Sequence, residues 1–514
     1  MTSSLCPKIF NDPIHGHVEL SPLSICIIDT PQFQRLRDIS QLGGVYYVFQ
    51  GASSKRFEHC IGVSYLARKF VSMLEKSQPE LEITPADILC VEIAGLIHDL
   101  GHGMFSHAFD GKFLPRVCPS NFVHEHASLG IFDILIKEND LLPKFNKYGL
   151  DGDDIHFIKE LVLGDEHEAP DGFEWKGRGD KTFLYDIVAN KRNGIDVDKF
   201  DYFARDSHVL GIAKSFDCNR LMTFARVYKV DSASGSNYQI CFHLKEAWNI
   251  FELFHTRYTL HKRAYQHKVS NAIELMIVEA LVHADPYIFL PGKDGVLKRM
   301  SETTTDFNAY WKYSEYILKQ IEHSYDKNLE AAKNMVTRIR KRDLFSLAGE
   351  ILLSPTLKEQ LKEALIIQQL VEIKIKNMEI NNIVDDKDLF VTVTKLGYGS
   401  GGSDPVSKRT TFFKPIKGSD DEIFTPNDND NNDFIRTSID GKVILGVLPP
   451  DSVSRLIPKE FEEIIVRVFA RRADQVRYAK ALFDEWAIQF QSSIDLTNGL
   501  TPIKRKRDEN DVEN

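Results

Sequence analysis

Apolar residues recur at helical spacing along much of this chain, up to about residue 340. In residues 85–100 this spacing is clear from Ile88 to Ile97, which predicts a buried helix that ends where Gly101 follows. The same pattern predicts further helices over residues 31–39, 57–74, 126–136, 183–190, 197–206, 245–283 and 307–323. The sequence therefore predicts a mainly α fold.

Short β-like runs interrupt this helical pattern. They cover residues 17–20 and 45–49, and two further runs between Val227 and Leu244 flank SASGS, which is typical of a hairpin. After residue 380, LFVTVT and KVILGVL predict strands, while residues 453–469 and 473–490 predict helices. The sequence thus indicates a helical body with small β-hairpins and a smaller α+β C-terminal lobe.

These patterns divide the chain into predicted parts. An N-terminal segment (1–50) precedes the helical body (51–345), the α+β lobe (346–491) and a tail (492–514). Inside the lobe, an acidic loop at about 418–433 (GSDDEIFTPNDNDNND) is almost free of apolar residues, as is the tail. Such segments cannot bury enough apolar surface to fold, so we expect both to be disordered.

Composition narrows the classes of function. No apolar run approaches the about 18 residues that span a bilayer, and the first residues lack the features of a signal peptide. We therefore expect no membrane span and a protein that stays inside the cell. Seven cysteines without a CxxC pair argue against a disulfide framework and a cysteine zinc site. A formal net charge of -10 disfavours a uniformly basic nucleic-acid binder and fits small anionic ligands better.

The densest chemistry lies at the end of a predicted helix. The stretch HDLGHGMFSH, residues 98–107, holds three histidines and an aspartate. His98 and Asp99 can offer an imidazole nitrogen and a carboxylate to one cation, and His59 and Asp198 are candidates for two further ligands. Two imidazoles and two carboxylates suit a borderline divalent ion such as iron, manganese or zinc.

The order His59, His98-Asp99, Asp198 is the H…HD…D pattern of the HD-domain phosphohydrolases. The surrounding segments are more specific: NDPIHGH, DTPQFQRLR, RFEH, HDLGHGMFSH, NKRNGIDVDKFDYFARD and FHTRYTLHKRAYQHK. Together they resemble the vertebrate SAM- and HD-domain deoxynucleoside triphosphate triphosphohydrolases, from Lys8 to about residue 505. Nothing before Lys8 resembles the SAM domain of that family, so we expect it to be absent.

The resemblance implies conversion of a deoxynucleoside triphosphate (dNTP) and water to deoxynucleoside and inorganic triphosphate, by an HD phosphohydrolase domain in residues 51–345. Cleavage at the α-phosphorus leaves an alkoxide-like 5′ oxygen, which needs a general acid. His107 is implied in that role, His124 and Glu125 as its supporting pair, and His102 as a contact to the phosphates. One active-site divalent metal (Fe, Zn or Mn) would be held by His59, His98, Asp99 and Asp198.

The resemblance also implies a substrate site. Triphosphate oxygens need cations and forked donors. Gln41 and Asp206 would hydrogen-bond the 3′ hydroxyl, while Tyr202 and Tyr265 would leave no room for a 2′ hydroxyl, which favours deoxyribose. The implied substrate-binding residues are Gln41, Leu42, Arg56, His102, His107, Lys199, Tyr202, Asp206, Arg257 and Tyr265.

A further set of residues resembles the regulatory nucleotide sites of the family. GTP or dGTP, with Asp29 accepting from guanine N1 and N2, and then a dNTP with bound Mg would convert homodimers to homotetramers. Ligands that bind only the assembled state draw dimers toward it by mass action. The implied allosteric residues are Lys8, Ile9, Phe10, Asn11, Asp29, Gln34, Arg37, Val48, Phe49, Arg220, His243, Lys245, His267, Lys268, Arg342 and Lys414.

Two positions depart from the mammalian pattern. Ser346 stands where a lysine would support the guanine site, and His243 stands where an arginine would meet the second site. These departures bear on the affinity for activators and, through His243, on its pH dependence.

The tail carries two short signals. Thr501 in TPIK fits the S/T-P-x-K pattern of cyclin-dependent kinases and resembles a regulatory threonine of the family. Phosphate there would add roughly -1.5 to -2 charge. The KRKR run over residues 504–507 predicts a nuclear localisation signal, so we expect the protein in the nucleus and also in the cytoplasm. By resemblance, low dNTP pools would restrict retroviruses and influence DNA replication and repair.

Two alternative interpretations stay open at this point. One is another HD phosphohydrolase, such as a phosphodiesterase or nuclease. The other is a nucleotide-gated scaffold that binds single-stranded nucleic acid. Product analysis separates both alternatives from the triphosphohydrolase, because only the triphosphohydrolase releases inorganic triphosphate. The sequence contains no GxxxxGK loop, which argues against a P-loop NTPase.

Overall fold

A computed structural model of the chain describes residues 7–118, 122–232, 235–377, 380, 383–407, 410–415, 437–439, 443–448 and 453–497. The chain divides into a larger unit, Met1–Arg342 with Gly397–Phe461, and a smaller unit, Asp343–Leu396 with Glu462–Asn514. The predicted acidic loop, Thr501 and the KRKR run lie outside the described residues.

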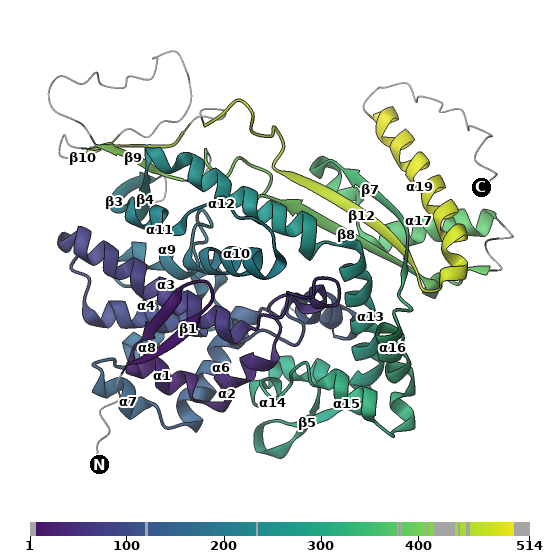
Figure 1. The fold of residues 1–514 in the computed structure, drawn as a ribbon, viewed down its shortest axis with the longest axis horizontal. Coiled ribbons are helices and arrows are strands. Elements are labelled where there is room, and N and C mark those ends of the chain that lie inside the picture. Colours follow the sequence, from purple (N-terminus) through teal and green to yellow (C-terminus); the bar gives the residue numbers. More distant parts are fainter. Residues whose placement is uncertain are drawn as a thin grey trace. The chain divides into compact units, whose positions relative to one another are not determined.

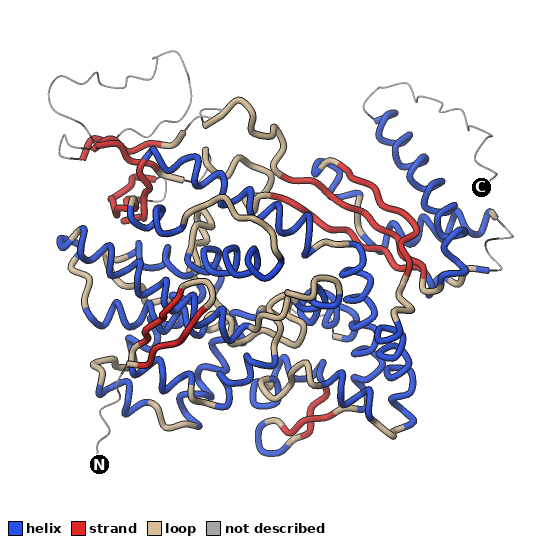
Figure 2. Tube along the Cα trace, in the orientation of Figure 1, coloured by secondary structure: helices blue, strands red, loops and turns tan. Residues whose placement is uncertain are grey.

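Helices dominate the larger unit, as Figures 1 and 2 show. They are α1 (Pro22–Ile28), α2 (Pro31–Gln34), α3 (Arg56–Ser77), α4 (Pro85–Ile97), α5 (Leu114–Val117), α6 (His124–Glu138), α7 (Leu142–Lys147), α8 (Gly152–Leu163), α9 (Tyr185–Val188), α10 (Val197–Leu210), α11 (Cys218–Thr223), α12 (Ala247–Leu260), α13 (Lys268–Ala284), α14 (Phe307–Tyr310), α15 (Ile317–His323) and α16 (Glu330–Lys341). The mainly α fold class is confirmed. No helix among the described residues is long and apolar enough to cross a membrane.

Helices α3 and α4 of this unit lie against each other. Helix α4 begins with a capping box, in which the Thr84 hydroxyl accepts from the Asp87 N–H and the Asp87 carboxylate accepts from the Thr84 N–H. A Cβ atom at Gly95 would lie 3.1 Å from the Cβ of Ala67 and from the carbonyl oxygen of Val63, so glycine permits this close approach. The contact holds the end of α4 beside α3.

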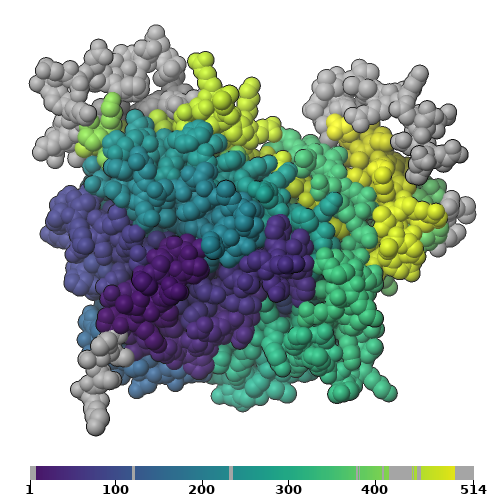
Figure 3. Space-filling model, viewed as in Figure 1, coloured from purple at the N-terminus to yellow at the C-terminus, as the bar shows by residue number. Residues whose placement is uncertain are grey.

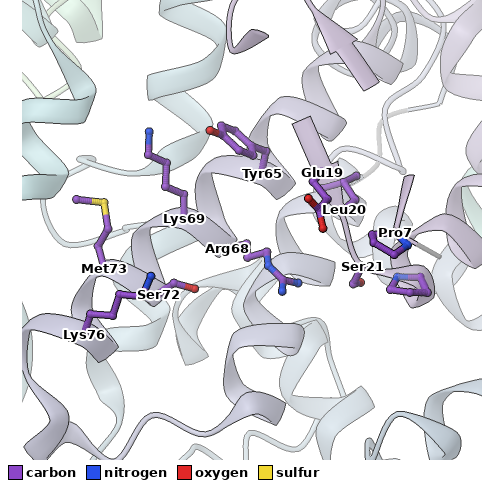
Figure 4. Close-up of a pocket in the computed structure, with 11 residues that line it drawn as sticks. Pro7, Glu19, Leu20, Ser21, Tyr65, Arg68, Lys69, Ser72, Met73 and Lys76 are labelled. Atoms are coloured by element: carbon purple, nitrogen blue, oxygen red, sulfur yellow. The ribbon is translucent and has the colours of Figure 1, made fainter. Parts of the chain in front are cut away.

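The larger unit also contains small sheets. β1 (Lys8–Asp12) and β2 (Gly16–Leu20) form an antiparallel hairpin, which lies at the molecular surface in Figure 3. β3 (Ala225–Ser232) pairs with β4 (Gly235–His243), which confirms the hairpin predicted around SASGS. β5 (Phe289–Pro291) pairs with β6 (Leu297–Arg299).

The sheet built on β3 and β4 changes the predicted domain boundaries. β9 (Phe412–Pro415) runs parallel to β4, with Phe242 opposite Phe412, and the strand order is β10-β11-β9-β4-β3. β10 (Thr437–Ile439) and β11 (Val443–Gly446) therefore belong to the larger unit. Residues 397–461 were predicted as part of the C-terminal lobe, but their strands extend a sheet of the helical body.

The smaller unit is an α+β structure. Its sheet has the order β7 (Ser346–Leu353), β12 (Glu462–Ala470), β8 (Leu389–Gly397), and α17 (Glu363–Lys376) and α19 (Val476–Thr497) contribute to its apolar core. A Cβ atom at Gly349 would lie 2.0 Å from the Phe483 ring, so glycine in β7 lets α19 pack closely.

Several predicted elements were wrong. Residues 45–49 belong to a short 3-10 helix (Gly43–Tyr47) and its C-terminal end rather than to a strand, because Gly43 turns the backbone with a φ of +47°. Residues 453–469, predicted as a helix, contain strand β12, which is buried on both faces and lacks the alternation that marks half-buried strands. The helix predicted over 245–283 is interrupted by a π-helical turn at His261–Tyr265.

Candidate active site

The predicted metal ligands meet where α3, α4 and α10 converge. Nε2 of His59, in the first turn of α3, lies 3.1 Å from Oδ1 of Asp198, near the start of α10. Nε2 of His98, which follows α4, lies 3.5 Å from the same oxygen. Oδ2 of Asp99 lies 3.4 Å from Nε2 of His59. These donor atoms, from positions far apart in sequence, therefore surround one point.

The outer nitrogen of each imidazole is fixed by another group. Nδ1 of His98 donates to the carbonyl oxygen of Gly95 over 2.9 Å, and Nδ1 of His59 donates to Asp201 over 2.8 Å. Each Nε2 then carries its lone pair toward the shared point. The buried Nε2 of His98 faces the carboxylates of Asp99 and Asp198, each at 3.5 Å. A borderline divalent cation fits this donor set of two imidazoles and two carboxylates.

The electrostatics of the ligand cluster favour positive charge. Burial would lower the pKa of His59, but hydrogen bonds with Asp198 and Asp201 raise that pKa to about 10. Burial would raise the pKa of Asp198, but its hydrogen bonds with His59 and His98 hold it well below the usual range. Protons and a cation therefore compete for this site, so metal binding should weaken in acid.

A second histidine cluster lies next to the ligands. Nε2 of His102 lies 3.2 Å from Oδ1 of Asp99, and the His102 ring stacks on the His124 ring at 3.8 Å between centroids. The His107 ring centroid lies 5.1 Å from that of His102. His124 Nε2 lies 3.4 Å from Oε2 of Glu125, so the predicted catalytic residues come together.

Asp110 belongs to this cluster and was missed by the sequence analysis. Its Oδ2 lies 3.3 Å from Nδ1 of His124 and 3.8 Å from Nδ1 of His107. Burial would lower the pKa of His124, but the hydrogen bond to Asp110 and the charge of Glu125 raise it. The available signal was the spacing of three residues from His107, which is one helical turn.

The loop between His102 and His107 has an unusual backbone. Phe105 and Ser106 have φ values of 59° and 54°, in the left-handed region that non-glycine residues rarely adopt. The Ser106 hydroxyl accepts from Nε of Arg56 over 3.0 Å and donates to the Ser40 carbonyl over 2.8 Å. These contacts hold a strained segment that leaves the His107 side chain 75% exposed.

The predicted sugar site contains a hydrogen-bonded pair, the buried Asp206 and the half-buried Tyr265. The Tyr265 hydroxyl donates to Oδ2 of Asp206, and burial raises the pKa of Asp206 to about 7. Oδ1 of Asp206 and Oε1 of Gln41 are buried without hydrogen-bond partners among the described residues. Leu42 is 7% exposed, and the Tyr202 ring centroid lies 6.2 Å from that of His59.

The predicted phosphate-binding cations are held by the protein itself. Lys199 Nζ lies 2.9 Å from Asp196, an Arg257 N–H donates to the Gly397 carbonyl over 2.7 Å, and Arg56 pairs with Asp99. Burial raises the pKa of Tyr202, while the charges of Arg257 and Lys199 oppose that rise, so both cations lie around this tyrosine.

His261 also lies in this region and was missed. Burial and the nearby charges of Arg257 and His107 lower its pKa to about 3, and its ring centroid lies 4.8 Å from that of Tyr265. The signal in the sequence was its spacing of four residues from both Arg257 and Tyr265, which shares a helical face.

The residues predicted for the guanine site lie on β1 and around α2. Nζ of Lys8 lies 3.8 Å from Oδ2 of Asp29, and Nε of Arg37 donates to Oε1 of Gln34 over 2.8 Å. The Arg37 guanidinium lies 3.5 Å from the centre of the Phe57 ring. Ile9, Phe10 and Asn11 continue β1, and an Arg342 N–H donates to the Tyr47 carbonyl.

The residues predicted for the second nucleotide site include a cluster around Phe224. Lys245 Nζ lies 3.2 Å and the Arg220 guanidinium 5.1 Å from the centre of this ring, and the His243 ring lies 6.2 Å away. His243 also lies 5.2 Å from the ring of Phe413. The other predicted residues of this site lie elsewhere. The ring centroids of Phe49 and His267 are 5.9 Å apart, and Val48 directly precedes Phe49. Lys268 is the first residue of α13, and Lys414 follows Phe413 in β9.

Comparison with known proteins decides the family. The HD domain model matches residues 56–206. The deoxynucleoside triphosphate triphosphohydrolase SAMHD1 of Xenopus laevis is 42% identical over 523 residues, which covers 97% of this chain and 77% of that relative. The protein of the same name from Homo sapiens is 42% identical over 486 residues, covering 93% and 73%. The chain belongs to the SAMHD1 family.

The SAMHD1 family extends beyond vertebrates. The SAMHD1 homolog of Dictyostelium discoideum is 36% identical over 476 residues, covering 93% of this chain and 80% of that protein. The matched HD domain begins at Arg56 and ends at Asp206, so it contains the predicted metal ligands and the histidine cluster. The resemblance drawn from the motifs is thereby confirmed.

Proposed function

We propose that this chain is a metal-dependent triphosphohydrolase that converts a dNTP and water to deoxynucleoside and inorganic triphosphate. The observation that carries the proposal is the joining of two clusters through Asp99. One of its oxygens faces the metal-ligand nitrogen of His59 at 3.4 Å, and the other faces His102 at 3.2 Å. The named vertebrate relatives carry this activity in their names.

The four ligand candidates would hold one divalent cation, which we propose to be Fe, Zn or Mn. When bound, it would supply activation of water and neutralisation of phosphate charge. Arg56, Lys199 and Arg257 would add positive charge around the triphosphate, and Arg56 is itself aligned by Asp99 and Ser106.

The histidine cluster would supply the proton for the leaving group. His107 is exposed and would face the 5′ oxygen of a bound substrate, where a protonated imidazole serves as general acid. Asp110 lies beside both His107 and His124, and Glu125 adds negative charge at His124. These carboxylates would favour the protonated form of His124, whose pKa they raise.

Two half-buried tyrosines, Tyr202 and Tyr265, would select the sugar. Tyr265, hydrogen-bonded to Asp206, and Tyr202 would form a wall that excludes a 2′ hydroxyl. Asp206 and Gln41 would offer the 3′ hydroxyl buried oxygens that have no hydrogen-bond partner within the described part of the chain. A buried oxygen gains most from a ligand that completes its hydrogen bonding. The proposed substrate is therefore a deoxynucleotide.

Nucleotides are also proposed as activators. GTP or dGTP would bind at Lys8, Asp29, Gln34 and Arg37, and a dNTP with Mg would bind near Phe224 between copies of the chain, converting homodimers to homotetramers. The exposed Lys8–Asp29 pair and the cations around Phe224 supply charge for such ligands.

We propose that the protein is present in the nucleus and the cytoplasm, where it controls dNTP pools. This control would restrict retroviruses and affect DNA replication and repair. We further propose that the protein binds single-stranded nucleic acid and that a cyclin-dependent kinase phosphorylates Thr501.

The first experiment incubates purified protein with dATP and Mg²⁺, with and without GTP, and separates the products by ion exchange. Deoxyadenosine and inorganic triphosphate released only with GTP support the reaction and the activator together. Release of both products without GTP would support the reaction and contradict the proposed guanine site. If the protein has bound metal but releases no triphosphate, the result would favour the phosphodiesterase or the scaffold interpretation.

A further inference from the structure

The nitrogen of His59 that faces away from the metal site leads into a buried chain of hydrogen bonds. Nδ1 of His59 lies 2.8 Å from Oδ2 of Asp201, and Nε2 of His15 lies 2.7 Å from Oδ1 of the same carboxylate. Because an ionised carboxylate only accepts, both imidazoles donate to it. The side chains of Asp201 and His15 are 0% and 8% exposed.

Arg205 completes this arrangement. Its Nε and one terminal nitrogen donate to the two oxygens of Asp201 over 2.9 and 2.8 Å, and the same terminal nitrogen donates to Asp12 over 2.9 Å. Asp12 also accepts from the backbone N–H groups of Ile14 and His15, which closes the β1–β2 turn. Asp201 therefore has donors on both oxygens and little freedom to rotate.

The packing of α3 is shaped around the same carboxylate. A Cβ atom at Gly62, one helical turn after His59, would lie 2.0 Å from Oδ1 of Asp201 and 2.6 Å from a nitrogen of Arg205. Any other residue at this position would displace the carboxylate. The ring of Tyr65, one turn further along α3, lies 5.6 Å from the ring of His15 and limits its orientation.

We propose that His15 and Asp201 are positioning residues for the metal ligand His59, so that docking of the β1–β2 hairpin sets metal affinity. Asp201 keeps the proton on Nδ1 of His59 and the lone pair on Nε2, and His15 holds Asp201 in the required rotamer. Partners of this kind change metal affinity by about 10- to 100-fold when removed.

The proposal deepens the proposed function and rests on its metal site. β1 also carries Lys8 to Asn11, which directly precede Asp12 and are proposed to bind an activator. Anything that stabilises the docked hairpin would then stabilise the liganded metal site, and the coupling is reciprocal. The metal site and the N-terminal segment are linked through side chains rather than through the backbone of the helical body.

The test measures metal binding directly, without turnover. Metal-free full-length protein is titrated with Mn²⁺, and free Mn²⁺ is followed by its EPR signal. His15→Phe keeps an aromatic ring against Tyr65 but cannot donate, whereas His15→Gln keeps a donor. We expect His15→Phe to bind Mn²⁺ about 10- to 100-fold more weakly than the wild type and His15→Gln to restore most of the affinity. His17→Ala, an exposed position in the same hairpin, is the matched control and should bind as the wild type does.

A second pair of variants tests the carboxylate without removing any donor. Gly62→Ala should weaken Mn²⁺ binding, while Gly152→Ala, at a position where nothing lies within 4 Å of the added atom, should not. Melting temperatures of the metal-free proteins show whether each variant is folded. If His15→Phe does not fold, His15→Ala replaces it. The comparison of Gly62→Ala with Gly152→Ala tests the role of Asp201 independently of the His15 variants.

The outcomes separate the two proposals. If His59→Ala binds Mn²⁺ as well as the wild type does, the proposed metal site itself is wrong. If His59→Ala loses binding but His15→Phe and His15→Gln bind equally, the positioning role is overturned and the metal site stands. Equal affinity of Gly62→Ala and wild type would also overturn the role of Asp201.

Discussion

The hydroxyl of Tyr265 donates a hydrogen bond to Oδ2 of Asp206. The half-buried Tyr265 lies in the π-helical turn that follows α12, and the buried Asp206 lies in α10. The pair joins two elements that the sequence places 59 residues apart. The second oxygen of Asp206 has no hydrogen-bond partner among the described residues. The Tyr265 hydroxyl therefore orients the carboxyl group, which can still accept a further hydrogen bond. The buried carboxyl of Asp206 therefore has a measurable consequence for the stability of the protein.

The first prediction concerns the pH dependence of stability. Burial raises the pKa of Asp206 to about 7, above its ordinary value of 3.8. Between these values the folded protein holds a proton that the unfolded chain releases, so the free energy of unfolding should fall as pH rises toward 7. Asp206→Asn should lack this decrease. Urea midpoints at pH 5 and pH 7.5 measure it, with exposed Asp171→Asn as the control; parallel pH dependence in all three proteins would contradict the prediction.

The second prediction concerns the general acid. His107→Ala should lower kcat for dNTP hydrolysis by about 10²- to 10⁴-fold, because the leaving oxygen loses its proton donor. Metal content and melting temperature should not change, since the His107 side chain is exposed. Steady-state kinetics with metal analysis measures both. The control is His208→Ala, another exposed histidine of the larger unit, and comparable losses in the two variants would argue against a specific role.

The third prediction concerns Asp110. Its hydrogen bond raises the pKa of His124 against the effect of burial, so Asp110→Asn should lower that pKa. If His124 must be protonated for turnover, the alkaline limb of the kcat profile should move to lower pH by about one unit or more. A uniform loss of activity with an unchanged pH profile would show that Asp110 acts only in folding.

The fourth prediction concerns the second activator site. Burial and the charge of Lys245 lower the pKa of His243, so this residue is neutral at pH 7. His243→Arg would add a permanent cation and should strengthen dNTP-driven tetramer formation by about tenfold. Mass photometry over a dNTP titration measures the effect. The affinity of the wild type for the activating dNTP should rise as pH falls below 6.5, because His243 then gains a proton. The variant should not show this rise.

The sequence by itself determined the local features of this protein. Helical spacing of apolar residues identified α3, α4, α6 and α10, because the core face of a helix repeats within a few residues. The density of ligand-type side chains in residues 98–107, with His59 and Asp198, indicated a metal site whose four donors do meet in the structure. The motifs around them indicated the family.

Tertiary structure decided what depends on contacts between distant positions. The apolar run in β12 was wrongly assigned to a helix, because a strand buried on both faces has no alternation to distinguish it. Residues 397–461 joined the larger unit through the pairing of β9 with β4 and through contacts such as the hydrogen bond from Arg257 to Gly397. His15 and Asp201 are 186 positions apart, and the sequence around either residue does not indicate that their side chains form a hydrogen bond. Hydrophobic periodicity records which face of an element is buried, whereas the partner of a buried polar atom is chosen by how the elements pack.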